Sequence, residues 1–446
     1  MASIDLERLL QDLAATQAAV RIHGEELRQD PEHAGNPYEA RRWVSGLSTF
    51  QALDPGDPAW PYLASWVLWF LLGRTSHEEE RREALARTRP SVQVTTPSPE
   101  EISWRQGVSR LVRATSEGER VTLAQALEVA AGPIHGASRE LWMRRGEVLR
   151  RAGGDSLAPL LQPMPTWASL LAEANALLEA TEDLARDTLG RPRNWTEALA
   201  QGVGQQGDVP WPRRLSPRWL LAPFEGEARW LEVPGLRLGV LPEVAGGSSV
   251  TRAMAHLGAR WADAAAPRHL PPPLGTLPSA LARTRSGALL ASLLLTRTFL
   301  RKGLGLSDAE ATRARRQQAR VVLVAVRLEA ARVLLLRPAL QGEGAQVRQE
   351  AEALTHRALG APIPAALALA FPQLHPTGPA RLLSFSLAAA DAFRLRNEHD
   401  EDWYRNPRAV LALRDRLDRA PDPTLREVET AQARKALVTA LLEALG

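Results

Sequence analysis

Apolar residues recur at helical spacing along most of this chain, and that pattern limits the folds it can adopt. Between Ile4 and Val20 they fall at intervals of three and four residues, the spacing that places side chains on one face of an α-helix. The stretch from Tyr62 to Leu72 is almost wholly apolar, as expected of a buried helix. Further helical patterns cover roughly 99–115, 122–151, 165–188, 250–265, 278–302, 307–337, 344–358, 380–396, 406–418 and 423–445. The sequence therefore predicts a mainly α protein.

One stretch interrupts this rhythm. Prolines recur between Trp211 and Gly247, and the pieces 228–233 and 236–240 alternate apolar and polar residues. We expect a small β-hairpin or edge-strand insert near 228–240 in an otherwise helical body.

Composition and charge exclude several classes of protein. The 446 residues include 55 basic and 51 acidic side chains and no cysteine. A net charge of only +4 makes nucleic acid an unlikely partner, and the absence of cysteine excludes disulfides and a thiolate nucleophile. No apolar run approaches the ~20 residues that span a bilayer, and residues 1–7 lack the features of a secretory signal. We expect a cytoplasmic protein with no membrane partner.

A helix pattern with a single histidine follows the glycine-rich turn 246–249. It reads VTRAMAHLGARWAD over 250–263, with the histidine at His256. Two later segments are TFLRKGLGLSDAE at 298–310 and DWYRNPRA at 402–409. In this order they resemble oligoendopeptidase-F-like (M3-type) zinc metallopeptidases, whose zinc helix reads HExGH and whose C-terminal segment reads DWWxNPxA. The similarity is patchy over 1–215 and fairly continuous over about 215–420.

The resemblance implies a two-lobed helical, metallopeptidase-like architecture, with an N-terminal lobe over 1–215 and a degenerate catalytic lobe over 216–446. It places His256 at the first zinc ligand, Leu257 at the general base and Arg260 at the second histidine ligand. A guanidinium does not deprotonate and repels Zn²⁺. We therefore expect no catalytic residue, bound metal or cofactor at these degenerate motif positions.

Two further requirements of that chemistry are missing. No aspartate or glutamate lies between Asp263 and Asp308, so the expected second helix offers no carboxylate ligand. No tyrosine lies between Tyr62 and Tyr404, so the late hydroxyls that stabilise the oxyanion in that family are absent.

The 250–263 helix also carries a stripe that predicts its packing. Val250, Met254, Leu257 and Trp261 follow helical spacing, so we expect Leu257 to face the core. A buried Arg260 needs an acidic partner. In sequence, the nearest candidates are Asp263 and Glu243.

Other charged groups are interpreted as solvated surface. They are the acidic segment 398–402, the pair Glu352 and His356, the tryptophans and arginines of 211–219, and the arginines at 313, 315, 316 and 320. Each could in principle hold a metal ion or a polyanion, but exposed helix faces and loops usually carry such residues.

These observations predict a catalytically inactive pseudopeptidase that acts as a regulatory or scaffold subunit and binds a polypeptide or protein partner, with an active metallopeptidase paralogue as one candidate. Two alternatives stay open. One is a working hydrolase with an unrecognised metal site, and the other is an arginine-rich helical protein that binds nucleic acid or an acidic protein.

Overall fold

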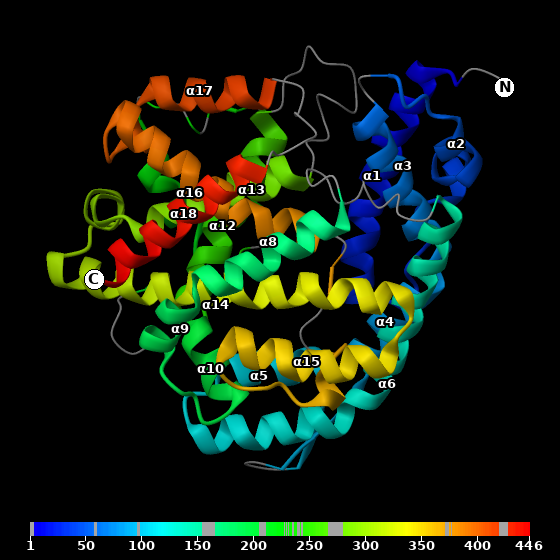
Figure 1. The fold of residues 1–446 in the computed structure, drawn as a ribbon, viewed down its shortest axis with the longest axis horizontal. Coiled ribbons are helices and arrows are strands. Elements are labelled where there is room, and N and C mark those ends of the chain that lie inside the picture. Colours follow the sequence, from blue (N-terminus) through cyan, green and yellow to red (C-terminus); the bar gives the residue numbers. More distant parts are fainter. Residues whose placement is uncertain are drawn as a thin grey trace.

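The computed structural model describes residues 4–57, 60–95, 99–153, 166–204, 211–226, 228, 230, 232–233, 236–238, 241, 244–265, 280–370, 374–375, 377–418 and 427–446. These residues form an almost entirely helical body (Figure 1), as the periodicity predicted. The first part contains α1 (Leu6–Gln29), α2 (Leu47–Ala52), α3 (Trp60–Thr75), α4 (His77–Thr88), α5 (Trp104–Arg113), α6 (Glu117–Arg151), α8 (Trp167–Ala180), α9 (Glu182–Leu189) and α10 (Trp195–Val203). The second contains α11 (Pro217–Leu221), α12 (Gly247–Ala265), α13 (Ala280–Ser292), α14 (Asp308–Gln341), α15 (Gly344–Leu359), α16 (Gly378–His399), α17 (Pro407–Asp418) and α18 (Glu427–Leu445).

Two strands form a hairpin, at a place that the sequence did not indicate. They are β1 (Pro90–Val94) and β2 (Glu100–Ser103), paired antiparallel with Val92 opposite Ile102. Both of these β-branched residues are buried, which is the environment that favours them in strands. The helix expected from 99 therefore begins only at Trp104.

The hairpin expected near 228–240 is absent from the residues described there, which form turns and irregular backbone. Of the residues described there, Trp230, Val233 and Leu238 are buried in a core with other apolar residues. The Trp230 indole donates a hydrogen bond to the carbonyl oxygen of Tyr404 at 2.6 Å, which ties this irregular segment to the late part of the chain.

Side-chain caps determine where several helices begin. At α5 the Ser103 hydroxyl accepts from the backbone N–H of Gln106, and the Gln106 side chain accepts from the N–H of Ser103. Ser307 and Glu310 make the same reciprocal pair at α14. Such capping boxes satisfy N–H groups that have no partner within the helix. α14 ends at Gly342, whose φ of 80° suits a residue without a Cβ atom.

α14 lies at the centre of the fold, and a single arginine anchors it there (Figure 1). Arg327 is buried, and its guanidinium donates hydrogen bonds to the carbonyl oxygens of Leu178, Arg357 and Ala358, the Thr181 hydroxyl and the Glu182 carboxylate. The three carbonyls lie in the last turns of α8 and α15, where they lack intrahelical donors. One side chain therefore caps two helices and joins them to α14.

Buried apolar side chains form two clusters. The larger joins α1 to α10 with α14, α15, α16 and α18. The smaller includes α12, α13 and an aromatic group made of Phe224, Trp230, Trp261, Phe299, Trp403 and Tyr404. A division of the chain into lobes at 215/216 stays a prediction.

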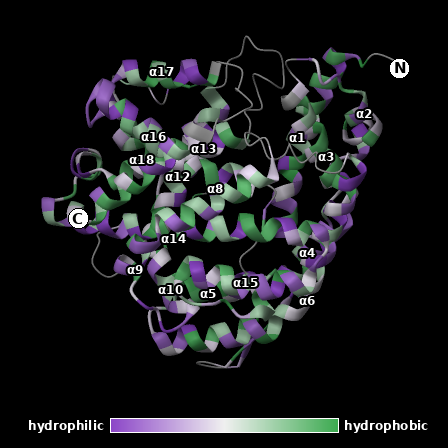
Figure 2. Cartoon of the chain, in the orientation of Figure 1, coloured by the Kyte–Doolittle hydropathy of each residue, from purple (hydrophilic) through white to green (hydrophobic). Residues whose placement is uncertain are grey.

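Hydrophilic residues alternate with hydrophobic ones along helices such as α6 and α15 (Figure 2). Within the part of the chain that the structure describes, no helix is long and apolar enough to cross a membrane.

Candidate functional site

α12 begins with a turn that is anchored to another helix end. The backbone N–H of Gly247 donates to the carbonyl oxygen of Gly204 at 2.7 Å, and the Ser249 hydroxyl accepts from the N–H of Ala245 at 2.9 Å. Gly246 leaves no room for a side chain, because a Cβ atom there would lie 2.2 Å from the Gly204 oxygen. This contact sets the direction in which α12 leaves the turn.

The apolar stripe of α12 is buried as predicted. Val250, Met254, Leu257 and Trp261 are each 3% exposed or less, and they belong to the smaller core cluster. Leu257 therefore contributes to packing, at the position where the resemblance expects a general base.

α12 and α13 cross in backbone contact. A Cβ atom on Gly258 would lie 2.3 Å from the carbonyl oxygen of Ser286, and one on Gly287 would lie 2.6 Å from that of Ala255. Such distances are far below van der Waals contact, so the crossing requires glycine at both positions. The close approach brings the arginines of α13 next to the C-terminal half of α12.

His256 and Arg260 both point to partners of their own. The His256 Nε2 atom lies 2.5 Å from the carbonyl oxygen of Leu238. A carbonyl oxygen only accepts, so Nε2 carries a proton and this nitrogen is not available to a metal ion, which leaves Nδ1 as the one ring nitrogen with a lone pair. The Arg260 guanidinium lies 3.7 Å from the Asp263 carboxylate, which confirms the first of its two expected partners. Glu243, the other candidate, lies outside the described residues.

Asp263 is shared between two helices. Besides Arg260 it contacts Arg283 of α13, whose Nε lies 2.7 Å from one carboxylate oxygen and whose Nη2 donates to the other at 3.1 Å. The side chains of Arg260 and Asp263 are each 27% exposed, so water reaches this group. The result is an arginine–aspartate–arginine cluster that links the end of α12 to α13.

A second cluster of the same kind links α13, α16 and α17. Asp391 is buried and accepts two hydrogen bonds from Arg285, at 2.7 and 2.9 Å, and one from Arg416. Burial alone raises the pKa of Asp391, but the charges and hydrogen bonds of the two arginines outweigh that effect and hold the pKa below its ordinary value. This carboxylate is therefore ionised, and both of its oxygen atoms accept hydrogen bonds from arginine.

Sequence reasoning missed both clusters, although one signal pointed to them. The acid-free span between Asp263 and Asp308 contains Arg283 and Arg285, which had to find carboxylates on other helices. Which carboxylates these would be depended on the packing of α13 against α12 and α16.

Several of the other candidate groups form hydrogen bonds or ion pairs within the fold. Glu352 accepts from the backbone N–H of Ala365 at 3.1 Å. In the acidic segment, Glu401 accepts from the Thr298 hydroxyl, and Asp402 lies 3.1 Å from the Lys302 ammonium. The arginines at 313, 315, 316 and 320 do not share one partner. Arg316 donates to the carbonyl oxygen of Gly446, and Arg315 donates to that of Leu295.

The donor set does not fit a catalytic zinc ion. Such a site uses three protein ligands, mostly histidine and carboxylate. Among the described residues, no group of three or more histidine, aspartate or glutamate side chains is arranged to hold a metal ion. At the three motif positions stand a protonated ring nitrogen, a core leucine and a guanidinium.

Comparison with known proteins identifies the fold. No protein-family model matches the sequence, and no curated protein matches it. Among solved structures, oligoendopeptidase-F from Enterococcus faecium is similar with a TM-score of 0.56 and 10% identity, over 98% of this chain and 92% of that chain. PZ peptidase A with an inhibitor is similar with a TM-score of 0.51 and 10% identity, over 99% and 98%. The chain thus has a mainly α, peptidase-like fold, which confirms the predicted fold class.

Proposed function

We propose that this chain is a non-catalytic M3-like pseudopeptidase that binds a polypeptide or protein partner. The observation that carries the proposal is the use of the motif positions: Leu257 is buried in the core, and His256 and Arg260 are engaged by Leu238 and Asp263. Activity requires a metal-bound water and a base to deprotonate it. Leu257 supplies no base, and His256 with Arg260 supplies at most one nitrogen lone pair where a catalytic zinc ion needs three protein ligands.

The surroundings of the motif support the same proposal. The α13 arginines and the carboxylates of Asp263 and Asp391 form ion pairs at the helices that would carry the metal centre. A zinc ion placed there would meet guanidinium groups that cannot give up their protons. Hydrogen-bonded ion pairs of this kind hold the helices together without any metal.

The binding role rests on what the fold retains. The similarity to oligoendopeptidase-F extends over 92% of that chain, so the fold is kept over nearly the whole length of a peptidase. A body of this size without catalytic donors is suited to hold a polypeptide or to pair with an active peptidase. Fold similarity alone does not assign activity, so this role requires direct measurement.

The catalytic half of the proposal is tested by metal analysis and peptide cleavage. The purified chain is expected to hold no stoichiometric zinc and to cleave no fluorogenic peptide when zinc is added. The double variant Leu257→Glu and Arg260→His is expected to stay inactive, because the third ligand is still missing. It is also expected to lose stability, since Leu257 gives up burial worth roughly 1.5–3 kcal/mol.

Two results would contradict this half. One is near-stoichiometric zinc that disappears in His256→Ala. The other is cleavage by the double variant in the presence of zinc. Either would favour a working hydrolase.

The binding half is tested with a fluorescent pool of unstructured peptides and with single-stranded DNA as the comparison probe. Peptide binding is expected, with DNA binding weak at physiological salt because the net charge is only +4. Sub-micromolar DNA binding with a steep salt dependence, and no peptide binding, would favour the nucleic-acid alternative.

A further inference from the structure

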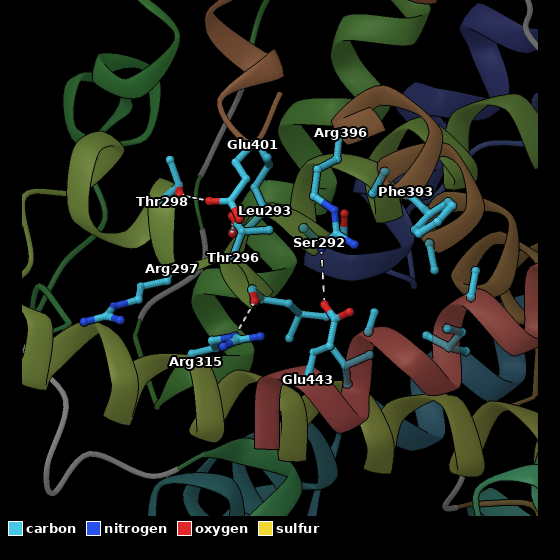
Figure 3. Close-up of a pocket in the computed structure, with 18 of the residues that line it drawn as sticks. Ser292, Leu293, Thr296, Arg297, Thr298, Arg315, Phe393, Arg396, Glu401 and Glu443 are labelled. Atoms are coloured by element: carbon cyan, nitrogen blue, oxygen red, sulfur yellow. Dashed lines mark hydrogen bonds and ion pairs between the residues drawn. The ribbon is translucent and has the colours of Figure 1, made fainter. Parts of the chain in front are cut away.

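A cavity of about 550 Å³ lies away from the motif positions of α12. Its walls come from the end of α13, the short helix Leu293–Leu295, the π-helical turn Phe299–Gly303, α14, α16 and α18, with Thr251 from the first turns of α12 (Figure 3). Of the described lining residues, none is His256, Leu257 or Arg260. The volume lies in the range of small-molecule sites.

The two ends of the cavity differ in chemistry. Figure 3 shows Phe393 on one side and Arg315, Arg297 and Thr298 on the other. The apolar side continues with Phe385 and Leu437 and with alanines of α16 and α18. Between the two ends Arg396 of α16 lies 3.3 Å from Glu443 of α18. A ligand that fills the space therefore meets an apolar wall at one end and polar groups at the other.

Of the cationic side chains that line the cavity, all but one have a carboxylate partner. Arg297 and Arg301 lie 2.7 and 3.0 Å from Asp308. Lys302 contacts Asp402, and Arg396 contacts Glu443. Arg315 is the exception among the residues that the structure describes: it forms no ion pair within 4.0 Å, although Glu443 and Glu401 act on its charge at longer range.

Arg315 is half-buried, and only one of its three nitrogen atoms is used. Its Nε donates to the carbonyl oxygen of Leu295 at 2.9 Å, and neither Nη group has a hydrogen-bond partner among the described residues. Burial lowers the pKa of Arg315, which reflects the cost of a partly desolvated charge. A guanidinium with two free N–H edges in a cavity is suited to bind a carboxylate.

The acidic groups of the wall limit how much negative charge a ligand can carry. Glu401 accepts from the Thr298 hydroxyl, and Glu443 is paired with Arg396. Both carboxylates also act on Arg315 at longer range, so they would repel a ligand with several negative charges, and a single carboxylate is the charge that the free Nη groups of Arg315 can accept. We propose that this cavity binds a monocarboxylate with an apolar body, its carboxylate on Arg315 and its body against Phe385, Phe393 and Leu437. This proposal stands whether or not the chain is catalytic.

The test is calorimetric titration of the full chain with decanoate, with decanol as the uncharged comparison. Decanoate is expected to bind and decanol to bind at least tenfold more weakly. Arg315→Gln is expected to weaken decanoate binding at least tenfold. Arg320→Gln is the matched control, because Arg320 is exposed on the same helix and does not line the cavity.

A second variant keeps the test decisive if Arg315→Gln folds poorly. Ala440→Trp places a large side chain in the cavity from α18 and is expected to abolish binding while Arg315 itself is kept. Urea unfolding curves of each variant serve to check that the variant is folded.

A second pair of probes distinguishes the two sources of such a carboxylate. These are an acetylated Ala-Leu-Leu tripeptide with a free C-terminal carboxylate and the same peptide as its C-terminal amide. Binding of the acid form but not the amide indicates a polypeptide C-terminus, and binding of decanoate alone indicates a free aliphatic acid. The proposal is overturned if neither carboxylate binds at about 1 mM, if decanol binds as well as decanoate, or if Arg315→Gln and Ala440→Trp bind like the unmodified chain.

Discussion

Replacing Asp391 by alanine tests whether the ion pairs around α13 hold the helices together. The variant leaves Arg285 and Arg416 without the carboxylate that accepts three of their hydrogen bonds. Removing one partner of a fully buried ion pair costs about 3–5 kcal/mol. The two arginine side chains are 30% and 37% exposed, so water replaces part of the lost interaction. We therefore expect a loss of about 2–3 kcal/mol in the free energy of unfolding.

The pH dependence gives a second readout. The pKa of Asp391 is lowered in the folded chain, so the folded state favours the ionised form. The stabilisation is fully present above the unfolded pKa of about 3.9 and is lost as the pH falls through the lower folded pKa. The difference between the unmodified chain and Asp391→Ala should therefore be constant near neutral pH and shrink below about pH 4.

The assay is urea unfolding followed by tryptophan fluorescence, since several tryptophans lie in the smaller core. Asp415→Ala is the matched control, because Asp415 is exposed on α17 beside Arg416. If Asp391→Ala unfolds within about 0.5 kcal/mol of the unmodified chain, as surface substitutions do, the clusters do not hold these helices and the reasoning is refuted.

Three further predictions concern other parts of the fold. Gly258→Ala should destabilise the chain by about 1–3 kcal/mol, because its Cβ atom would overlap the Ser286 carbonyl. Gly136→Ala, which also lies in α6 and has no atom within 4 Å of the added Cβ, should stabilise the chain by about 0.5–1 kcal/mol; equal effects in urea unfolding would show that the α12–α13 crossing is not tight. Arg327→Lys should lower the free energy of unfolding by about 2–3 kcal/mol, because an ammonium cannot reproduce its buried fork of donors; an unchanged unfolding midpoint would contradict this. Burial, with a smaller effect from His77, lowers the pKa of His23 in the folded chain, so the free energy of unfolding should decrease as the pH is lowered below about 6.5. His23→Asn should make this pH dependence weaker. Parallel pH profiles of the variant and the unmodified chain would show that His23 is not the group responsible.

The amino-acid sequence determined the class of the fold and much of α12. Helical spacing is a local property, so it located most helices and the buried stripe that includes Leu257. The i, i+3 spacing also brought Arg260 to Asp263, because helix geometry alone makes them neighbours. The order of weak motifs carried the resemblance that the solved structures support at the level of the fold.

Tertiary structure decided what depends on contacts distant in sequence. The alternation near 228–240 is the same whether a segment pairs as a strand or packs onto a core, and the burial of Trp230, Val233 and Leu238 there depends on contacts distant in sequence. Arg285 and Asp391 are 106 residues apart, and no local pattern relates them. The same holds for Arg315, whose unpaired N–H groups became visible only when α14, α16 and α18 enclosed a cavity around them. Local spacing fixes a helix and its faces, whereas the partner of each face is decided by packing over the whole chain.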